Sequence, residues 1–202
     1  IKPRAVKVGM VNDIDTINAI ADTLANYDIQ HLVVDPVMVA TSGARLMQDE
    51  AVEVFTKKLL PMASLLTPNV PEAEVLAGIP INDKDSMEKA AHIIHSKGCK
   101  ALLIKGGHIE GRKIDRLYTA MGMEREYEAA NVATRNTHGT GCTLSSAITS
   151  YLAMGYAIGE AIAAAKEWLT GALIAGANVE IGSGHGPVNH FYNPQKTIIK
   201  TK

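Results

Sequence analysis

The chain has 202 residues, of which 47% are apolar and 20% are charged, and its formal net charge is −1. So high an apolar fraction with so little net charge excludes an intrinsically disordered protein. The balance of charges also argues against a nucleic acid or an anionic membrane surface as the partner. The length favours one domain over residues 1–202.

Short β-rich runs alternate with amphipathic helical runs in the first half of the chain. Residues 5–10 predict a strand, and Asp13 stands where a helix N-cap belongs, before apolar residues at helical spacing. The apolar run 31–35 is typical of a parallel strand that is covered on both faces. The next predicted elements are a loop over 40–46, a helix over 49–60, a strand over 64–67 and a helix that Pro71 opens.

The second half continues this alternation and then becomes helical. Residues 83–97 predict a helix with apolar residues on one face, and residues 101–104 predict a fourth strand. A β-hairpin at the margin of the sheet is expected around Met121 and Gly122. Alanine-rich helices are predicted over 142–154 and 157–175. Strand–helix alternation of this kind predicts a mostly parallel α/β sheet.

The two cysteines, Cys99 and Cys142, cannot form a disulfide framework, which favours a reducing compartment, the cytoplasm. The longest uncharged stretch covers residues 136–159. Glycines and hydroxyl side chains interrupt it, whereas a membrane span is apolar throughout. We therefore interpret it as a loop followed by a buried helix.

The most informative local feature is the string Asn136-Thr137-His138-Gly139-Thr140-Gly141-Cys142-Thr143. Two glycines one residue apart let the backbone approach a ligand closely, and the N–H groups at a helix start suit a phosphate. The string is not a Walker A loop, and Leu144 stands where the dinucleotide fingerprint has its third glycine. A tight loop before a core helix fits the same spacing, so both interpretations stay open.

Cys142 lies near the predicted start of that helix. A thiol at a helix N-terminus has a lowered pKa, so it can act as a thiolate or a general base near neutral pH. Most free cysteines are instead buried and inert, and this alternative also stays open for Cys142. For Cys99, just before the fourth predicted strand, we expect the inert role.

Polar residues stand at the ends of several predicted strands. Asn69 and Glu72 follow the third strand, where an amide and a carboxylate suit a hydrated magnesium ion. They would equally serve as an N-cap and a dipole partner of the next helix. Asp35 ends the second strand and Lys105 follows the fourth. Strand ends in open parallel sheets form the ligand crevice, so these side chains can converge with the glycine loop on a phosphate and a metal.

The histidines and the C-terminal glycines indicate less. His92 and His95 have a spacing that suits a metal, but no third ligand is evident, which favours a solvated helix face. The glycine-rich stretch 182–187 is more typical of a turn than of a second phosphate site.

Six stretches of the sequence together carry a family resemblance: Val8 to Met10, Val34 to Met38, Thr67 to Glu74, Lys105 to His108, Asn136 to Cys142 and Gly184 to Phe191. They resemble the ribokinase-like superfamily and, within it, the hydroxymethylpyrimidine/phosphomethylpyrimidine kinases of thiamine biosynthesis. The likeness extends over essentially the whole chain, and the string 136–142 is its most specific part. It implies a three-layer α/β/α fold with a mostly parallel central sheet and helices on both faces.

The resemblance implies an ATP- and Mg²⁺-dependent kinase. Its substrates would be 4-amino-5-hydroxymethyl-2-methylpyrimidine and the monophosphate of that compound, which becomes the diphosphate. Gly139, Thr140 and Gly141 would form the anion hole over the transferring phosphoryl group, with Lys105 beside it. Cys142, at the position where most ribokinase-like enzymes have an aspartate base, would activate the substrate oxygen.

The resemblance also implies binding residues. Asn69 and Glu72 match the Asn-x-x-Glu element that helps to organise Mg²⁺. It also implies that Asp35 is a metal ligand. The residues that it places beside the nucleotide are Asp35, Asn69, Thr137 and Lys105. Those that it places at the pyrimidine are Met10, Val37 and Cys142. A homodimer is expected because an exposed apolar helix face often makes one in this superfamily.

Two other functions stay open. Related vitamin B6 kinases also have a cysteine in this loop, so pyridoxal or pyridoxine is an alternative substrate. The family begins with a further strand and glycine-rich loop that do not precede Ile1, and we expect the sequence to be incomplete at its N-terminus. A chain truly truncated there would instead be a non-catalytic ligand-binding module.

Overall fold

A six-stranded sheet forms the centre of the computed structural model, which describes residues 2–39, 46–107 and 114–194. Its strands lie in the order β1-β2-β3-β4-β5-β6. The parallel strands are β1 (Ala5–Val8), β2 (His31–Val34), β3 (Leu65–Leu66) and β4 (Ala101–Gly107). The hairpin of β5 (Ile114–Thr119) and β6 (Gly122–Glu128) continues the sheet in antiparallel fashion. The predicted sheet and its marginal hairpin are confirmed.

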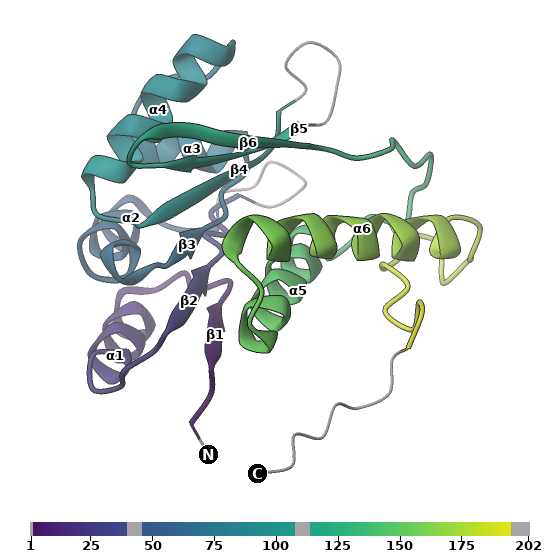
Figure 1. Cartoon of the computed structure of the whole chain (residues 1–202), viewed down its shortest axis with the longest axis horizontal. Helices are drawn as coiled ribbons and strands as arrows, with labels where there is room; N and C mark the ends of the chain where they lie inside the picture. Colours follow the sequence, from purple (N-terminus) through teal and green to yellow (C-terminus); the bar gives the residue numbers. More distant parts are fainter. Residues whose placement is uncertain (1, 40–45, 108–113, 195–202) are drawn as a thin grey trace.

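Helices cover both faces of the sheet (Figure 1). One face carries α1 (Ile14–Leu24), α2 (Asp49–Val54), α3 (Val70–Ala77) and α4 (Lys84–Ser96). The other face carries α5 (Thr140–Met154) and α6 (Ile158–Gly176). Each face buries its own apolar cluster, so the three-layer α/β/α fold is confirmed.

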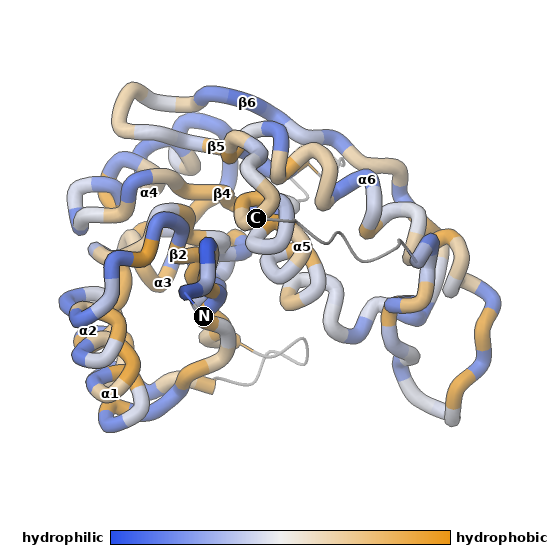
Figure 2. The backbone as a smooth tube through the Cα atoms, turned by 60° about the horizontal axis from the view of Figure 1, so that its bottom comes forward, coloured by the Kyte–Doolittle hydropathy of each residue, from blue (hydrophilic) through white to orange (hydrophobic). Residues whose placement is uncertain are grey.

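Successive residues of the parallel strands face opposite layers. In β2, Val33 belongs to the cluster under α5 and α6, whereas Val34 belongs to the cluster under the other four helices. Because both faces are covered, the strand is apolar without alternation. The hydropathy colours show the same contrast: β2 and β4 are hydrophobic, whereas β6 at the margin is largely hydrophilic (Figure 2).

Local capping explains where two helices begin. Asp13 accepts a hydrogen bond from the Thr16 N–H at 2.8 Å, which confirms the predicted N-cap of α1. Asp83 caps α4 in the same way, through the N–H of Ser86 at 2.7 Å. The predicted apolar face of α4 is buried, through Met87, Ala90, Ala91 and Ile94.

Two element boundaries away from the site differ from the predictions. β1 ends at Val8 rather than at residue 10, since the N–H of Val37 bonds to the Asp35 carbonyl and does not continue the ladder. The helix predicted over 49–60 is α-helical only to Val54. It then widens into a π-helical turn over Phe55–Leu59 and tightens into a 3-10 turn over Leu60–Met62, which contains a proline without an N–H.

Two further differences concern the predicted site. β4 continues to Gly107, so Lys105 lies within a strand and not in the loop after it. α5 begins at Thr140 rather than at Cys142, because Gly139 adopts a left-handed φ of 81° as its N-cap. Residues 40–45 of the loop predicted over 40–46 lie outside the described residues, as does His108.

The uncharged stretch over residues 136–159 is a loop followed by a helix, as predicted. Hydroxyl groups of α5 donate to backbone carbonyls of the preceding turn, from Thr149 to Ser145 at 2.7 Å and from Ser150 to Ser146 at 3.0 Å. Among the described residues, no helix is long and apolar enough to cross a membrane.

Candidate functional site

Side chains from three neighbouring strands meet at the carboxyl edge of the sheet. Lys105 of β4 places its Nζ 2.7 Å from Oδ1 of Asp35, which follows β2. Thr67, after the intervening β3, donates its hydroxyl to the same carboxylate oxygen at 3.0 Å. The structure therefore brings together Asp35 and Lys105, two predicted site residues that are 70 positions apart in the sequence.

Asp35 is fully buried, with 0% of its surface exposed. Its second oxygen, Oδ2, accepts a hydrogen bond from the hydroxyl of Ser145 in α5 at 3.0 Å. Asp35 thus links the ends of β3 and β4 to α5, the helix that follows the glycine loop. Neither hydroxyl partner, Thr67 or Ser145, was predicted from the sequence as a site residue. For Ser145, the local signal in the sequence is a polar residue on the apolar face of α5, next to Leu144 and three residues before Ile148.

The glycine loop turns sharply into α5. Thr140 directs both its N–H and its hydroxyl back to the carbonyl of Thr137, at 3.2 Å and 2.5 Å. The first N–H groups of a helix have no acceptor within the helix, and here these include the N–H groups of Gly141 and Cys142. Together with the positive end of the helix dipole, they make this end of α5 suitable for an anion.

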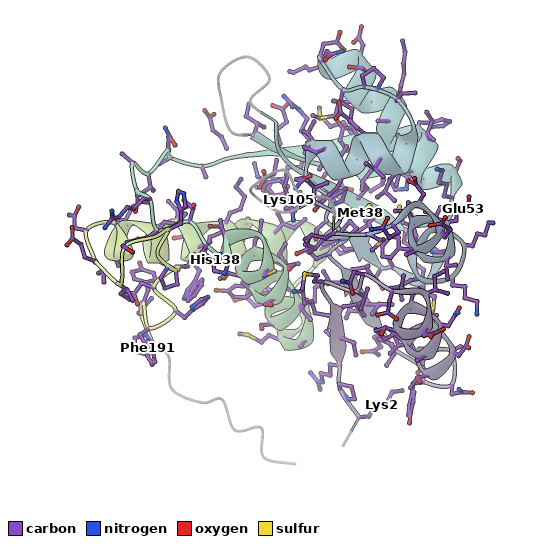
Figure 3. The ribbon with its side chains drawn as sticks, turned by 180° about the vertical axis from the view of Figure 1, so that it is seen from behind. Lys2, Met38, Glu53, Lys105, His138 and Phe191 are labelled. Atoms are coloured by element: carbon purple, nitrogen blue, oxygen red, sulfur yellow. The ribbon has the colours of Figure 1, made fainter. Side chains whose placement is uncertain are left out.

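The ammonium group of Lys105 lies against this helix start. A Cβ atom added at Gly141 would lie only 3.3 Å from Lys105 Nζ. Figure 3 shows Lys105 near the middle of the molecule. The lysine charge and the N-terminus of α5 therefore face the same space, and no side chain at position 141 separates them. Two positive groups so placed suit a phosphate.

The two cysteines occupy opposite environments. Cys142 is the third residue of α5, and it is exposed. Cys99 is buried, and burial raises the pKa of its thiol to about 12. The inert role expected of Cys99 agrees with this environment. Cys142 is accessible to a ligand at the helix start, and its role as a base stays a prediction.

Asn69 and Glu72 form a reciprocal cap at the start of α3. Asn69 Oδ1 accepts the Glu72 N–H, and Glu72 Oε2 accepts the Asn69 N–H, both at 2.8 Å. Glu72 Oε1 also accepts the N–H of Met38 at 3.3 Å. The N-cap interpretation of these residues is therefore confirmed.

The carboxylates predicted as magnesium ligands already accept hydrogen bonds from protein groups on both oxygens. Asp35 and Glu72 are also 0% and 2% exposed. This arrangement does not fit direct coordination by either carboxylate. It fits a hydrated ion that reaches Asn69 and Glu72 through its own water molecules. The described part of the chain contains no group of three or more histidine, cysteine or acidic side chains that could hold a metal.

Burial of Glu72 predicts a pH dependence of stability. Desolvation raises the pKa of this carboxyl above 4.5, against the opposing effect of Lys105. As pH rises above that value, the unfolded chain loses its proton first, so the free energy of unfolding falls through this range. In urea denaturation from pH 4 to pH 7, the stability of the wild type relative to Glu72→Gln should therefore decline. A difference that stays constant or grows would contradict the raised pKa.

The C-terminal segment supports the glycine loop from the side of α6. The N–H of His138 donates to the Gly186 carbonyl at 3.1 Å, and the N–H of Val188 donates to the His138 carbonyl at 3.3 Å. Thr143 Oγ1 lies 2.9 Å from His190 Nε2, within hydrogen-bond distance. The stretch 182–187, predicted as a turn, therefore also fixes the position of the loop.

Asn136 anchors the beginning of the same loop. Its buried side-chain amide donates to the carbonyls of Gly176 and Val179, each at 2.7 Å. Replacing Asn136 by alanine is expected to lower the free energy of unfolding by about 2 to 3 kcal/mol, because two hydrogen bonds of the buried amide are lost: the Val179 carbonyl loses this donor, and the Gly176 carbonyl keeps the N–H of Val179. Urea denaturation measures this change. Asn26→Ala is the matched control, since its exposed amide also donates to a carbonyl, and we expect a change below about 0.5 kcal/mol. Equal losses in the two variants would contradict the anchoring role.

The remaining predicted binding residues lie at the same edge of the sheet or on the loop. Met10 and Val37 follow the neighbouring strands β1 and β2, Met10 being 61% exposed and Val37 half-buried. Thr137 is exposed in the loop before α5. Their roles at the pyrimidine and the nucleotide stay predictions.

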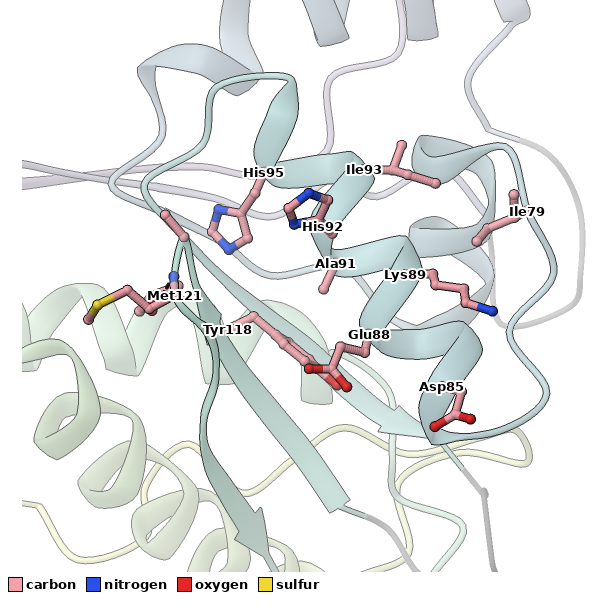
Figure 4. A pocket seen from close by; sticks show the side chains of 13 residues that line it. Ile79, Asp85, Glu88, Lys89, Ala91, His92, Ile93, His95, Tyr118 and Met121 are labelled. Carbon is pink, nitrogen blue, oxygen red and sulfur yellow. Dashed lines mark hydrogen bonds between the residues drawn. The ribbon is translucent and has the colours of Figure 1, made fainter.

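A large hollow lies away from this site. Its volume is about 830 Å³, and it opens between α4 and the β5–β6 hairpin (Figure 4). Thr119, directly before the hairpin turn, pairs with Ala101 at the beginning of β4, whereas Lys105 is near the end of β4. His92 and His95 line this hollow. His92 is exposed, as expected for a solvated helix face, and His95 Nδ1 lies 3.0 Å from the Cys99 carbonyl.

Comparison with known proteins places the chain in a family. The family model of phosphomethylpyrimidine kinase matches residues 1–189. The chain belongs to this family. It is 45% identical to the hydroxymethylpyrimidine/phosphomethylpyrimidine kinase of Rhizobium meliloti over 190 residues, which cover 94% of this chain and 71% of that protein. It is 46% identical over 187 residues to a thiamine biosynthesis bifunctional protein of Geobacter sulfurreducens, of which it spans only 38%.

Solved structures agree with the family and with the ribokinase-like fold. Phosphomethylpyrimidine kinase of Clostridium difficile matches with a TM-score of 0.74 and 44% identity, over 84% of this chain and 69% of that chain. Pyridoxal kinase of Staphylococcus aureus in complex with ADP matches with a TM-score of 0.83 and 32% identity, over 93% and 68%. The relatives are phosphotransferases, and the predicted enzyme class and family resemblance are confirmed.

Proposed function

We propose that this chain uses ATP to phosphorylate hydroxymethylpyrimidine and then converts the resulting monophosphate to the diphosphate. The observation that carries the proposal is the position of Lys105 Nζ, which lies 3.3 Å from the point where a Cβ atom added at Gly141 would stand, at the start of α5. A cation and free helix N–H groups thus lie close together, and the exposed thiol of Cys142 belongs to the same first turn of α5. Relatives of the same family bear the name of this activity, and the Staphylococcus aureus pyridoxal kinase binds ADP and AMP-PCP.

In this proposal, the transferring phosphoryl group lies between Lys105 and the N–H groups of Gly141 and Cys142. The substrate oxygen attacks the γ-phosphorus, the bond from that phosphorus to ADP breaks, and Cys142 takes the hydroxyl proton in the first reaction. Gly139 supplies the left-handed turn on which the loop depends. Phosphoryl transfer requires little covalent help, so positioning and charge stabilisation dominate.

The other predicted residues have supporting roles. Asp35 holds Lys105 in place, because its buried carboxylate accepts from Lys105 Nζ at 2.7 Å. Asn69 and Glu72 would hold Mg²⁺ through water, and the ion would neutralise phosphate charge. Thr140 belongs to the anion loop, and Thr137 contacts the nucleotide. Met10 and Val37 line the pyrimidine pocket.

The test is an assay of the full-length protein with ATP, Mg²⁺ and one acceptor at a time. Hydroxymethylpyrimidine, phosphomethylpyrimidine and pyridoxal are the three acceptors. Formation of the pyrimidine diphosphate supports the proposal, because only the thiamine route requires that second transfer. Binding of nucleotide without any product would instead indicate the non-catalytic module.

Pyridoxal kinase is the second candidate, because the Staphylococcus aureus enzyme has the higher TM-score, 0.83 against 0.74. That enzyme was also solved in complex with pyridoxal. Sequence identity favours the pyrimidine kinase, at 44% against 32%. A kcat/KM for pyridoxal that exceeds the value for hydroxymethylpyrimidine would make pyridoxal kinase the first candidate function and the pyrimidine kinase the second. The cytoplasmic location and the homodimer stay predictions.

A further inference from the structure

A second buried ion pair lies beside Lys105. Lys166 of α6 places its Nζ 2.6 Å from Oδ2 of Asp115 in β5, and the two side chains are only 11% and 9% exposed. The other oxygen of Asp115, Oδ1, accepts the backbone N–H of Gly106 at 2.5 Å. Asp115 therefore contacts the residue that directly follows Lys105 in β4.

The backbone at this point is irregular. Ile104 pairs with Arg116, and Gly107 pairs with Ile114, so two residues of β4 stand opposite Asp115 alone. Such a bulge leaves backbone groups outside the ladder and changes the direction of the side chains around it. Gly106 adopts a left-handed φ of 44° there. The Asp115 carboxylate thus accepts from the backbone N–H at the bulge.

Anchoring of α6 does not require this ion pair. The helix already buries a row of apolar and small residues against the sheet, namely Ala161, Ile162, Ala165, Leu169 and Ala172. A buried carboxylate without a partner is costly, and Lys166 supplies the compensating charge. The pair is therefore explained better by what Asp115 holds, which is the backbone next to Lys105.

We propose that Asp115, compensated by Lys166, is a positioning residue that fixes the β4 bulge and so directs Lys105 toward Asp35 and the start of α5. This inference rests on the proposed role of Lys105 in phosphoryl transfer. Lys105 has 16% of its side chain exposed and is otherwise enclosed, so the backbone direction at the bulge determines where its Nζ lies. Removal of the Asp115 carboxylate frees the bulge and moves the ammonium group.

The first experiment measures kcat and KM per folded protein for Asp115→Ala. A small misplacement of a catalytic group can cost about 100-fold in rate, so we expect a fall in kcat of about 10- to 100-fold with little change in the KM of the pyrimidine. The double variant Asp115→Asn/Lys166→Met keeps a carbonyl acceptor for the Gly106 N–H and leaves no lone charge. It should recover most of the activity, and it provides a second test if the alanine variant does not fold.

The ion pair between Arg116 and Glu126 is the matched control. It joins the same strand β5 to β6, with Arg116 Nε 2.8 Å from Glu126 Oε1, and Arg116 also contacts Met87 of α4 on the opposite face. Glu126→Gln removes one charge of that pair on β6, a strand that pairs with β5 and not with β4. We expect it to lower thermal stability and to leave kcat unchanged. An equal loss of kcat in Glu126→Gln and Asp115→Ala would overturn the proposal.

A double-mutant cycle decides whether Asp115 acts through Lys105. In a Lys105→Met background, Asp115→Ala should cause no further fall in kcat. If Asp115→Ala lowers kcat by the same factor in that background as in the wild type, the positioning role is overturned and the proposed function stays intact. If Lys105→Met alone keeps the wild-type kcat, the proposed role of Lys105 fails, and the positioning role fails with it.

Discussion

Replacing Cys142 by alanine is expected to lower kcat for the first phosphorylation by about 100- to 10,000-fold, the usual contribution of a positioned general base. The thiol is exposed at the start of α5. Its removal therefore leaves no cavity, and the thermal unfolding temperature should stay close to that of the wild type. Steady-state assays with saturating ATP and hydroxymethylpyrimidine measure the effect.

Cys99→Ala provides the matched control for the loss of a thiol. Cys99 is buried, with a pKa raised to about 12, so we expect lower stability and an unchanged kcat. Iodoacetamide at neutral pH should inactivate the wild type and the Cys99→Ala variant alike, because Cys142 is the accessible thiol. A Cys142→Ala variant with wild-type turnover would show that another group, or water, takes the proton.

Replacing Lys105 by methionine should lower kcat by about 100- to 1,000-fold, as does loss of one preorganised group that stabilises transition-state charge. The ammonium group lies beside the helix start at Gly141, so charge that develops on the phosphoryl oxygens loses this cation. The same change leaves the fully buried Asp35 carboxylate without its ion partner. Removal of one member of a buried pair costs about 3 to 5 kcal/mol, which urea denaturation measures.

The double variant Asp35→Asn/Lys105→Met separates these two effects. It removes both charges, so most of the lost stability should return, since no lone carboxylate stays buried. The asparagine amide keeps its oxygen as an acceptor for one of the two hydroxyl groups, those of Thr67 and Ser145, and presents its NH2 group to the other. Activity should stay as low as in Lys105→Met. Recovery of kcat together with stability would show that Lys105 matters only for folding.

Much of the fold follows from local patterns in the sequence. The N-caps at Asp13 and Asn69 and the hairpin around Gly122 depend on neighbouring residues and on backbone geometry. The doubly covered sheet follows from strands that are apolar without alternation, such as β2. The glycine loop was predictable for the same reason, because its string is contiguous and a helix follows it directly.

The contacts that define the site could not be predicted in this way. Lys105 meets Asp35 across 70 residues, and Ser145 meets Asp35 across 110. Residues so far apart in the sequence meet only because β2, β3 and β4 lie side by side and α5 packs against β1 and β2. Sequence patterns place each residue at a strand end, but the pairing depends on the order of the strands.

What the sequence determined by itself is therefore the set of elements, the glycine loop with Cys142, and the family. Only the tertiary structure decided how the polar residues are used. It commits both oxygens of Asp35 and of Glu72 to protein donors, and it shows Asp115 bound to the Gly106 N–H at a bulge. The physical reason is that a buried carboxylate must find its donors, and here several of them belong to other elements of the chain.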